Sequence, residues 1–190
     1  MNPALVAATA VICLAAPALA QTANQGRTAL PAPPAGQALA QAGLVDAAGQ
    51  TIGTAAFIQT PSGVLIQLRL DKIPPGVHGL HIHENARCQP PDFQSAGGHF
   101  NPGGRSHGLL DQGGPHAGDL PNVAASQNGQ VWADILTDRV TLGTGTDSLF
   151  GGNGTALVLH ATPDDYRTDP AGAAGGRVAC GPIMRMTQPR

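Results

Sequence analysis

Histidines are concentrated in one stretch of this 190-residue chain, between Val77 and Asp119. Six of the seven histidines lie there, and the seventh, His160, ends an apolar run at residues 156–159. Imidazole is the commonest protein ligand for metal ions, although a single histidine is usually a surface or hydrogen-bonded core residue. Six histidines in one segment that an aspartate closes therefore predict a metal centre. We interpret the stretch as a site for two metal ions.

The first group of candidate ligands is the sequence His81-Ile82-His83. Successive side chains of a β-strand point to opposite faces, so in a strand His81 and His83 share one face. These two imidazoles can bind one ion between them. His78 has the opposite parity, and we expect it to point away and form structural hydrogen bonds. A ligand role for His78 is the alternative.

The second group lies in residues 85–121, which show neither helical nor strand periodicity and contain eight glycines. A loop of this length is uncommon in a compact domain unless it is functional or cross-linked. Its potential ligands are His99, His107, His116 and Asp119. Three imidazoles and a carboxylate suit tetrahedral zinc. Because the loop has few core-forming residues, we expect the metal to stabilise its folding as well.

The elements that must position these groups read as short strands joined by turns. Glycine and proline number 26 and 17, short apolar runs recur, and no helix of useful length is indicated. Strands are predicted at residues 38–45, 51–60, 64–70, 77–84, 123–126, 130–135, 155–160 and from residue 177 onward. About eight antiparallel strands with two long irregular loops, residues 85–121 and 161–176, indicate an all-β sandwich or flattened barrel. The only tryptophan, Trp132, is interpreted as a packing residue.

The N-terminus predicts export. Residues 5–16 are a short apolar run and Ala18-Leu19-Ala20 is a small-residue cleavage pattern. Because the run is shorter than the roughly 20 apolar residues that span a bilayer, no membrane anchor is expected after cleavage. We interpret residues 1–20 as a signal peptide, 21–37 as an Ala/Pro-rich tether and 38–190 as one periplasmic domain. A disordered apolar N-terminus is the alternative.

Cleavage would leave two cysteines, Cys88 and Cys180. In an oxidising compartment two such cysteines are expected to form a disulfide, and a pair of buried thiols is the alternative. The chain-entropy model gives at most about 4–5 kcal/mol of stabilisation for so long a closed loop. The net charge of −2 indicates neither a nucleic acid nor a membrane surface as partner.

Five motifs in register resemble the copper,zinc superoxide dismutase family, and most of all its exported bacterial members. They are residues 78–84 (His-Gly-Leu-His-Ile-His-Glu), 95–102 (Ser-Ala-Gly-Gly-His-Phe-Asn-Pro), 116–119 (His-Ala-Gly-Asp), Leu159-His160 before Asp164, and 175–181 (Gly-Gly-Arg-Val-Ala-Cys-Gly). The likeness covers nearly all of residues 38–186. It implies a Greek-key β-sandwich.

The resemblance also implies a role for each matching residue. Copper would be bound by His81, His83, His99 and His160, and zinc by His99, His107, His116 and Asp119. His99 would bridge the two ions through both ring nitrogens. Asp164 would hydrogen-bond one copper and one zinc histidine, and Arg177 would guide and hydrogen-bond the superoxide anion. Cys88 and Cys180 would form the disulfide within the subunit.

The function that the resemblance implies is disproportionation of superoxide to dioxygen and hydrogen peroxide, as antioxidant defence in the cell envelope. Zinc cannot change oxidation state, so copper would carry the electron, with His99 and Arg177 as the catalytic residues. The family's bacterial members differ in assembly, so homodimer and monomer both stay open.

Two alternatives to this enzyme remain. A non-catalytic copper-handling protein of the same fold would be expected to carry transfer cysteines such as Cys-x-Cys, which this sequence lacks. In a purely structural zinc domain, His81, His83 and His160 would be core residues, and each ring would need a hydrogen-bond partner. Metal content separates these possibilities, because the enzyme would hold one copper and one zinc.

Overall fold

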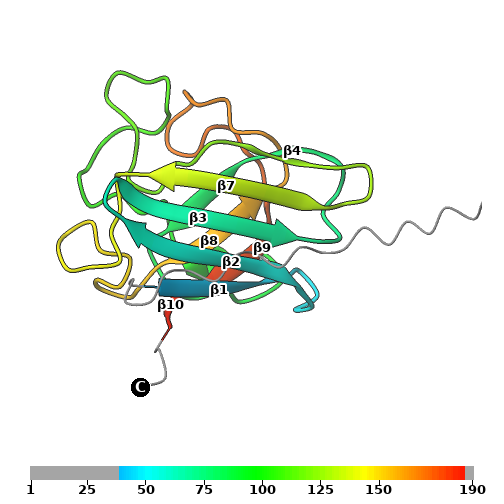
Figure 1. Cartoon of the computed structure of the whole chain (residues 1–190). Coiled ribbons are helices and arrows are strands. Elements are labelled where there is room, and N and C mark those ends of the chain that lie inside the picture. Colours follow the sequence, from blue (N-terminus) through cyan, green and yellow to red (C-terminus); the bar gives the residue numbers. More distant parts are fainter. Residues whose placement is uncertain (1–38, 187–190) are drawn as a thin grey trace, which may run out of the picture. The chain divides into compact units, whose positions relative to one another are not determined.

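The structure, a computed structural model, describes residues 39–186, whose regular elements are antiparallel β-strands and one 3-10 turn (Figure 1). The proposed signal peptide and tether, residues 1–37, lie outside the described residues, as do residue 38 and residues 187–190 of the predicted domain. No helix within the described part is long and apolar enough to cross a membrane.

The strands agree with the expected all-β architecture, and the described residues form ten of them. They are β1 Leu39–Asp46, β2 Thr51–Thr60, β3 Gly63–Leu70, β4 Gly76–His78, β5 Leu80–His83, β6 Val123–Ala125, β7 Val131–Thr137, β8 Ala156–His160, β9 Arg177–Pro182 and β10 Met184–Arg185. The two beyond the expected eight have simple origins. The predicted strand at residues 77–84 divides at Gly79 into β4, which pairs with β6, and β5, which pairs with β8. The other is β10, a two-residue pairing with β1.

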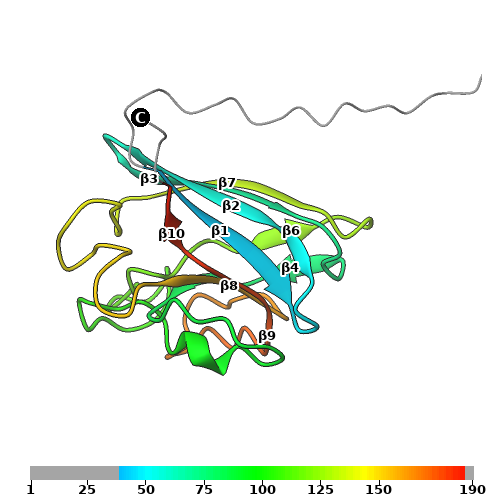
Figure 2. The same ribbon diagram turned by 90° about the horizontal axis from the view of Figure 1, so that it is seen from below.

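One continuous sheet runs in the order β4-β6-β7-β3-β2-β1-β9-β8-β5 and folds back on itself. The fold-back occurs at β1, which pairs with β2 along its length and with β9 only at Val45 and Asp46. In Figure 1, β8 and β9 pass behind β2 and β3, and Figure 2 shows them as a separate layer below β1 and β2. The predicted antiparallel sandwich or flattened barrel is confirmed.

Alternating side chains place the main core between these layers. In β3 every second residue is buried, from Val64 to Leu70, which is the pattern of a strand with one face on the core. Apolar residues of the other layer, such as Leu80, Ile82 and Leu157, belong to the same core cluster. The two layers therefore bury one shared apolar interior.

The layer of β5, β8 and β9 is also covered on its outer face. All four residues of β5 are buried: Leu80 and Ile82 face the core, so His81 and His83 face outward. Residues 84–122 and 161–176 lie on that side (Figure 2), and they contain the two irregular loops expected at residues 85–121 and 161–176. The outer face of this layer is where the histidines gather.

The interpretation of Trp132 as a packing residue is wrong. Its side chain is 58% exposed on β7, and the guanidinium of Arg69 lies 5.3 Å from the ring centroid. Trp132 has the outward parity in β7, since Val131 and Ile135 are buried, and strand parity overrides its apolar character.

Candidate metal centre

Four histidine rings converge above the outer face of β5 and β8. His81 and His83 come from β5, His160 ends β8, and His99 comes from the loop and pairs as an isolated bridge with His83. Each offers one ring nitrogen to a group whose atoms all lie within 4.8 Å of one another. We call these four residues the first cluster.

Protein acceptors occupy the outward nitrogens of three of these rings. His81 Nε2 lies 2.7 Å from Asp164 Oδ2, His83 Nδ1 lies 3.0 Å from the Gly97 carbonyl oxygen, and His160 Nδ1 lies 3.2 Å from the Gly175 carbonyl oxygen. Since each acceptor takes an N–H, the other nitrogen of each ring is left with its lone pair. Those lone pairs are directed into the first cluster.

The second cluster consists of His99, His107, His116 and Asp119. Asp119 Oδ1 lies 2.9 Å from His99 Nδ1, 3.1 Å from His107 Nδ1 and 3.2 Å from His116 Nδ1, and the last nitrogen lies 3.4 Å from His99 Nδ1. Ligands at the corners of a tetrahedron around zinc, each about 2.0–2.1 Å from the ion, would be roughly 3.3 Å apart. The donor atoms already have the spacing of a tetrahedral zinc site.

His99 belongs to both clusters. Its Nδ1 faces Asp119, while its Nε2 is buried and has no hydrogen-bond partner among the described residues. His81 Nδ1, in the first cluster, is buried and unpaired in the same way. Buried polar atoms almost always have a partner, so two unpaired nitrogens in one histidine cluster indicate an ion between them. A cluster of imidazole nitrogens alone fits copper, and the three imidazoles with a carboxylate fit zinc.

The carboxylate of Asp164 contacts one histidine of each cluster. Its Oδ2 lies 2.7 Å from His81 Nε2 and its Oδ1 lies 3.1 Å from His107 Nε2. Asn122 fixes the backbone of Asp164 by accepting from its N–H and donating to its carbonyl oxygen. Such outer partners orient metal-binding imidazoles and set their tautomers.

Burial and neighbouring charges set the protonation of these groups. Burial lowers the pKa of His81 to about 4 and that of His160 to about 3, so both imidazoles are neutral and able to bind a metal at neutral pH. Burial also holds the pKa of His83 well below its ordinary value. Although burial alone would raise the pKa of Asp119, its hydrogen bonds with His107 and His99 hold that pKa far below the usual range. Asp119 is therefore a carboxylate.

A cleft of about 590 Å³ opens onto the first cluster and is lined by His83, His99, His160 and Arg177, among others. Arg177 begins β9 and pairs directly with His160 of β8. Its guanidinium donates to the carbonyl oxygens of Phe93 and Gly97, at 2.7 and 2.6 Å. The structure therefore brings the predicted anion-guiding arginine to the edge of the cluster.

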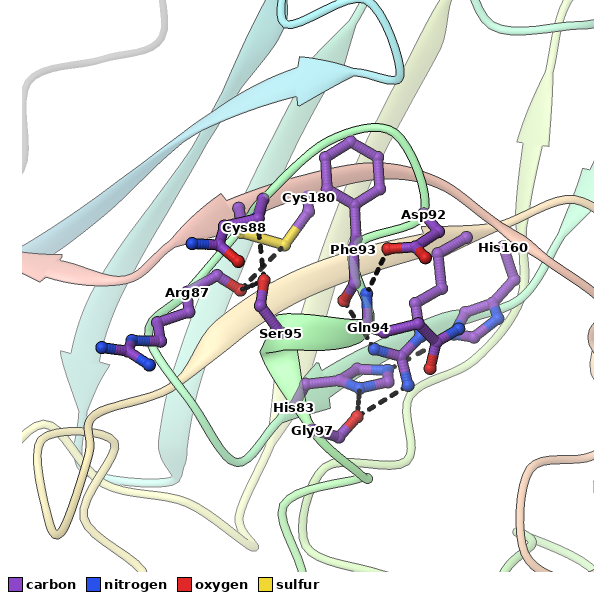
Figure 3. Close-up of a disulfide and its surroundings, with 12 residues drawn as sticks. His83, Arg87, Cys88, Asp92, Phe93, Gln94, Ser95, Gly97, His160 and Cys180 are labelled. Atoms are coloured by element: carbon purple, nitrogen blue, oxygen red, sulfur yellow. Dashed lines mark hydrogen bonds between the residues drawn. A yellow bond between two sulfur atoms is a disulfide. The ribbon is translucent and has the colours of Figure 1, made fainter.

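The disulfide predicted between Cys88 and Cys180 is formed, with 5.5 Å between the two Cα atoms (Figure 3). Cys180 lies on β9, three residues after Arg177, and Cys88 lies in the irregular loop. The bond fastens the first part of that loop to the strand that carries Arg177.

His78 lies outside both clusters. Its Nδ1 is 2.8 Å from the carbonyl oxygen of His160 and its Nε2 is 2.8 Å from that of Pro74. His78 is thus a buried connection between β4 and the end of β8, and the structure gives no support to the alternative in which it is a ligand.

Sequence reasoning did not single out several residues that shape the site. The carbonyl oxygens of Phe93, Gly97 and Gly175 position side chains through the backbone, which a sequence pattern does not display. Asn122, three residues after Asp119, offered no signal beyond that proximity. Gly172 has φ +64 and a Cβ there would collide with the Asp164 carboxylate, so only glycine fits.

Comparisons with known proteins agree with this site. A family model described as copper/zinc superoxide dismutase matches residues 51–183. Over 146 residues the chain is 52% identical to copper-zinc superoxide dismutase 2 of Aquifex aeolicus, covering 76% of this chain and 85% of that one. The structure of copper/zinc superoxide dismutase from Brucella abortus matches with a TM-score of 0.63 and 29% identity, covering 75% of this chain and 97% of that one.

A second solved structure, of a SOD-like protein from Bacillus subtilis, matches with a TM-score of 0.72 and 34% identity, covering 74% of this chain and 95% of that one. The family model spans well over half of the chain, and the relatives share its strands as well as its sequence. The chain therefore belongs to the copper/zinc superoxide dismutase family.

Proposed function

We propose that this chain is a superoxide dismutase that converts two superoxide anions and two protons to dioxygen and hydrogen peroxide, in the cell envelope. The observation that carries the proposal is the buried His99 ring, whose two nitrogens face two different clusters with metal-binding geometry. Bound copper supplies the one-electron chemistry, and bound zinc, which is redox-inert, supplies structure and charge.

The chain's own residues have distinct tasks in this proposal. His81, His83, His99 and His160 hold the copper, and His99, His107, His116 and Asp119 hold the zinc. His99 lines the cleft, and its imidazole, when Nε2 is not bound to copper, could carry a proton to the product. Asp164 fixes the His81 and His107 rings and prevents them from rotating out of their clusters.

Arg177 is the substrate-binding residue. It lines the cleft beside three histidines of the first cluster and carries a fixed positive charge. Two of its N–H groups are held by backbone carbonyls, and the others are left to hydrogen-bond a small anion. A cation at the bottom of a cleft also raises the encounter rate of an anionic substrate.

Export to the periplasm is supported by the apolar run at residues 5–16 with its Ala-Leu-Ala pattern, and by the Cys88–Cys180 disulfide. Disulfides persist in oxidising compartments. Cell fractionation followed by N-terminal sequencing tests this part, and the mature chain is expected to begin at Gln21. A full-length protein in the cytoplasm would contradict it.

The catalytic part is tested by metal analysis combined with a superoxide-decay assay. We expect one copper and one zinc for each chain, and a turnover that is mostly lost in His99→Ala.

Arg177→Ala is expected to slow superoxide consumption about tenfold or more and to weaken its salt dependence, while both metals stay bound. Full activity of His99→Ala with both metals present, or loss of copper in Arg177→Ala, would refute the assignments.

A further inference from the structure

The guanidinium of Arg177 rests on two backbone carbonyls of one short loop segment. Nη1 donates to the Phe93 carbonyl oxygen at 2.7 Å, and Nη2 donates to the Gly97 carbonyl oxygen at 2.6 Å. These residues flank the 3-10 turn Gln94–Ala96. The Gly97 oxygen also faces His83 Nδ1, so it serves the first cluster as well, whereas the Phe93 oxygen contacts neither cluster.

The backbone of Phe93 has an unusual conformation. Its φ of 55° and ψ of 21° lie in the left-handed region, which costs free energy for a residue with a Cβ. Phe93 precedes the 3-10 turn, and the first N–H of that turn, that of Gln94, donates to Asp92 Oδ1 at 3.1 Å. The peptide that follows Phe93 carries the carbonyl oxygen bound by Arg177, so its direction depends on this conformation.

The Phe93 ring explains why the conformation persists. It is fully buried in a second apolar cluster with Ala96, Ala156, Val158 and Cys180, separate from the main core. Strained backbone conformations survive where the surrounding structure determines them. In Figure 3 the ring of Phe93 extends toward Cys180 on one side of its backbone, and Gly97 and His83 lie on the other side.

We propose that Phe93 is the positioning residue for Arg177: its buried ring holds a left-handed backbone whose carbonyl sets the direction of the guanidinium. The proposal rests on the proposed function, in which Arg177 binds superoxide. Gly97 alone would hold the guanidinium by a single N–H and leave it free to rotate about that bond. With both carbonyls in place, the remaining N–H donors of Arg177 face the cleft in one orientation.

The test compares Phe93→Ala, Arg177→Lys and the double variant. Alanine at this position fills little of the second apolar cluster. The backbone is therefore expected to relax out of the left-handed region and to turn the carbonyl away from Arg177. Lysine keeps the charge but cannot span two carbonyls. Each single variant is expected to slow superoxide consumption about tenfold, the order of one charge-assisted hydrogen bond, with both metals retained and the salt dependence kept.

The double variant carries the decisive result. If Phe93 acts through Arg177, adding Phe93→Ala to Arg177→Lys slows superoxide consumption by at most about a further twofold. The reason is that Arg177→Lys has already removed the guanidinium that the Phe93 carbonyl orients. A rate loss in the double variant that equals the product of the two single-variant losses would overturn the proposal. Inhibition by inorganic phosphate is expected to weaken in parallel with the rate in both single variants.

A second readout does not depend on activity. In the zinc-loaded, copper-free protein labelled with ¹⁵N-arginine, the Arg177 side-chain N–H groups are expected to be protected from exchange, and Phe93→Ala is expected to remove that protection. Phe57→Ala is the matched control, because Phe57 is equally buried but belongs to the main core. It should lower stability and leave the Arg177 signals unchanged; Phe57→Leu replaces it where the alanine variant does not fold.

The results separate this inference from the proposed function. An Arg177→Lys variant with an unchanged rate would refute the role of Arg177 itself. A slow Arg177→Lys variant beside an unaffected Phe93→Ala variant would refute only the role of Phe93. Unchanged exchange protection in Phe93→Ala would refute it too.

Discussion

At the residue scale, the site depends on which nitrogen of each imidazole is occupied. The first cluster uses the ring nitrogen that the protein leaves free, and the other nitrogen donates to Asp164, Gly97 or Gly175. His99 is the exception, because its two nitrogens face the two clusters. A neutral imidazole can bind a metal through one nitrogen only when its tautomer is fixed, and hydrogen bonds fix it here.

Asp164 gives the sharpest test of this idea. In Asp164→Asn one of the two imidazole N–H groups would face the amide NH₂ in place of an oxygen, so one ring loses its acceptor. The affinity for copper and zinc is expected to fall about 10- to 100-fold. Competition with a chelator measures it. Asp138→Asn, an exposed aspartate after β7, is the control, and equal metal affinity in the two variants would contradict the prediction.

At the element scale, two loops with little apolar content are held in place by specific contacts. The loop at residues 84–122 is fastened by the Cys88–Cys180 disulfide and by the second cluster, and that at residues 161–176 by Asp164 and Gly172. Ordering such loops costs conformational entropy, and apart from Phe93, Leu120 and two alanines their apolar residues are not fully buried. We infer that metal binding and loop folding are coupled.

Gly172 makes that coupling testable. A Cβ at Gly172 would displace the Asp164 carboxylate, so Gly172→Ala is expected to lower metal affinity by roughly the amount seen for Asp164→Asn. Gly104→Ala is the matched control, because Gly104 has a similar φ of +57 and open space around its Cα. Chelator competition on both variants separates crowding from backbone strain; a similar loss in both would show that strain alone is responsible.

At the scale of the whole molecule, burying many imidazoles makes the stability of the metal-free protein depend on pH. Burial lowers the pKa of His81 from 6.5 to about 4 and that of His160 to about 3, so between pH 6.5 and these values the unfolded chain binds protons that the folded chain does not. Although burial opposes it, the His81 hydrogen bond holds the pKa of Asp164 at about 2, so its contribution is present above 3.8 and is lost on further acidification. The free energy of unfolding therefore falls as the pH drops below 6.5.

His107 acts in the opposite direction. Burial lowers its pKa, but hydrogen bonds to Asp119 and Asp164 outweigh burial and raise the pKa to about 9. Its stabilisation is complete below pH 6.5 and is lost as the pH rises through 9. We expect urea unfolding of the metal-free protein, prepared with a chelator, to show maximal stability near pH 6.5. A free energy of unfolding that increases toward pH 4 would contradict this.

Adding zinc to the metal-free protein should then raise stability and flatten the alkaline side of this curve. Binding to the folded state alone stabilises by mass action, and a metal at His107 Nδ1 replaces the proton that titrates there. The same urea series with zinc present measures both effects.

The sequence by itself determined the strands, the turns and the chemistry of the site. Strand parity put His81 and His83 on one face, and the predicted strand ranges, such as residues 51–60 and 64–70, match β2 and β3 closely. These inferences succeed because they depend on neighbours within a few residues. The resemblance to a family then supplied the expected roles of His99, Asp164 and Arg177.

Only the tertiary structure decided how distant backbone groups meet the site. Gly79 divides the histidine strand between two layers, Trp132 faces solvent, and Phe93 and Gly97 offer carbonyls to Arg177 from about 80 positions away in the chain. Every residue carries the same carbonyl, so nothing in a residue's identity says which one will be used. That choice is made by packing, because the fold brings one carbonyl rather than another within reach of a guanidinium.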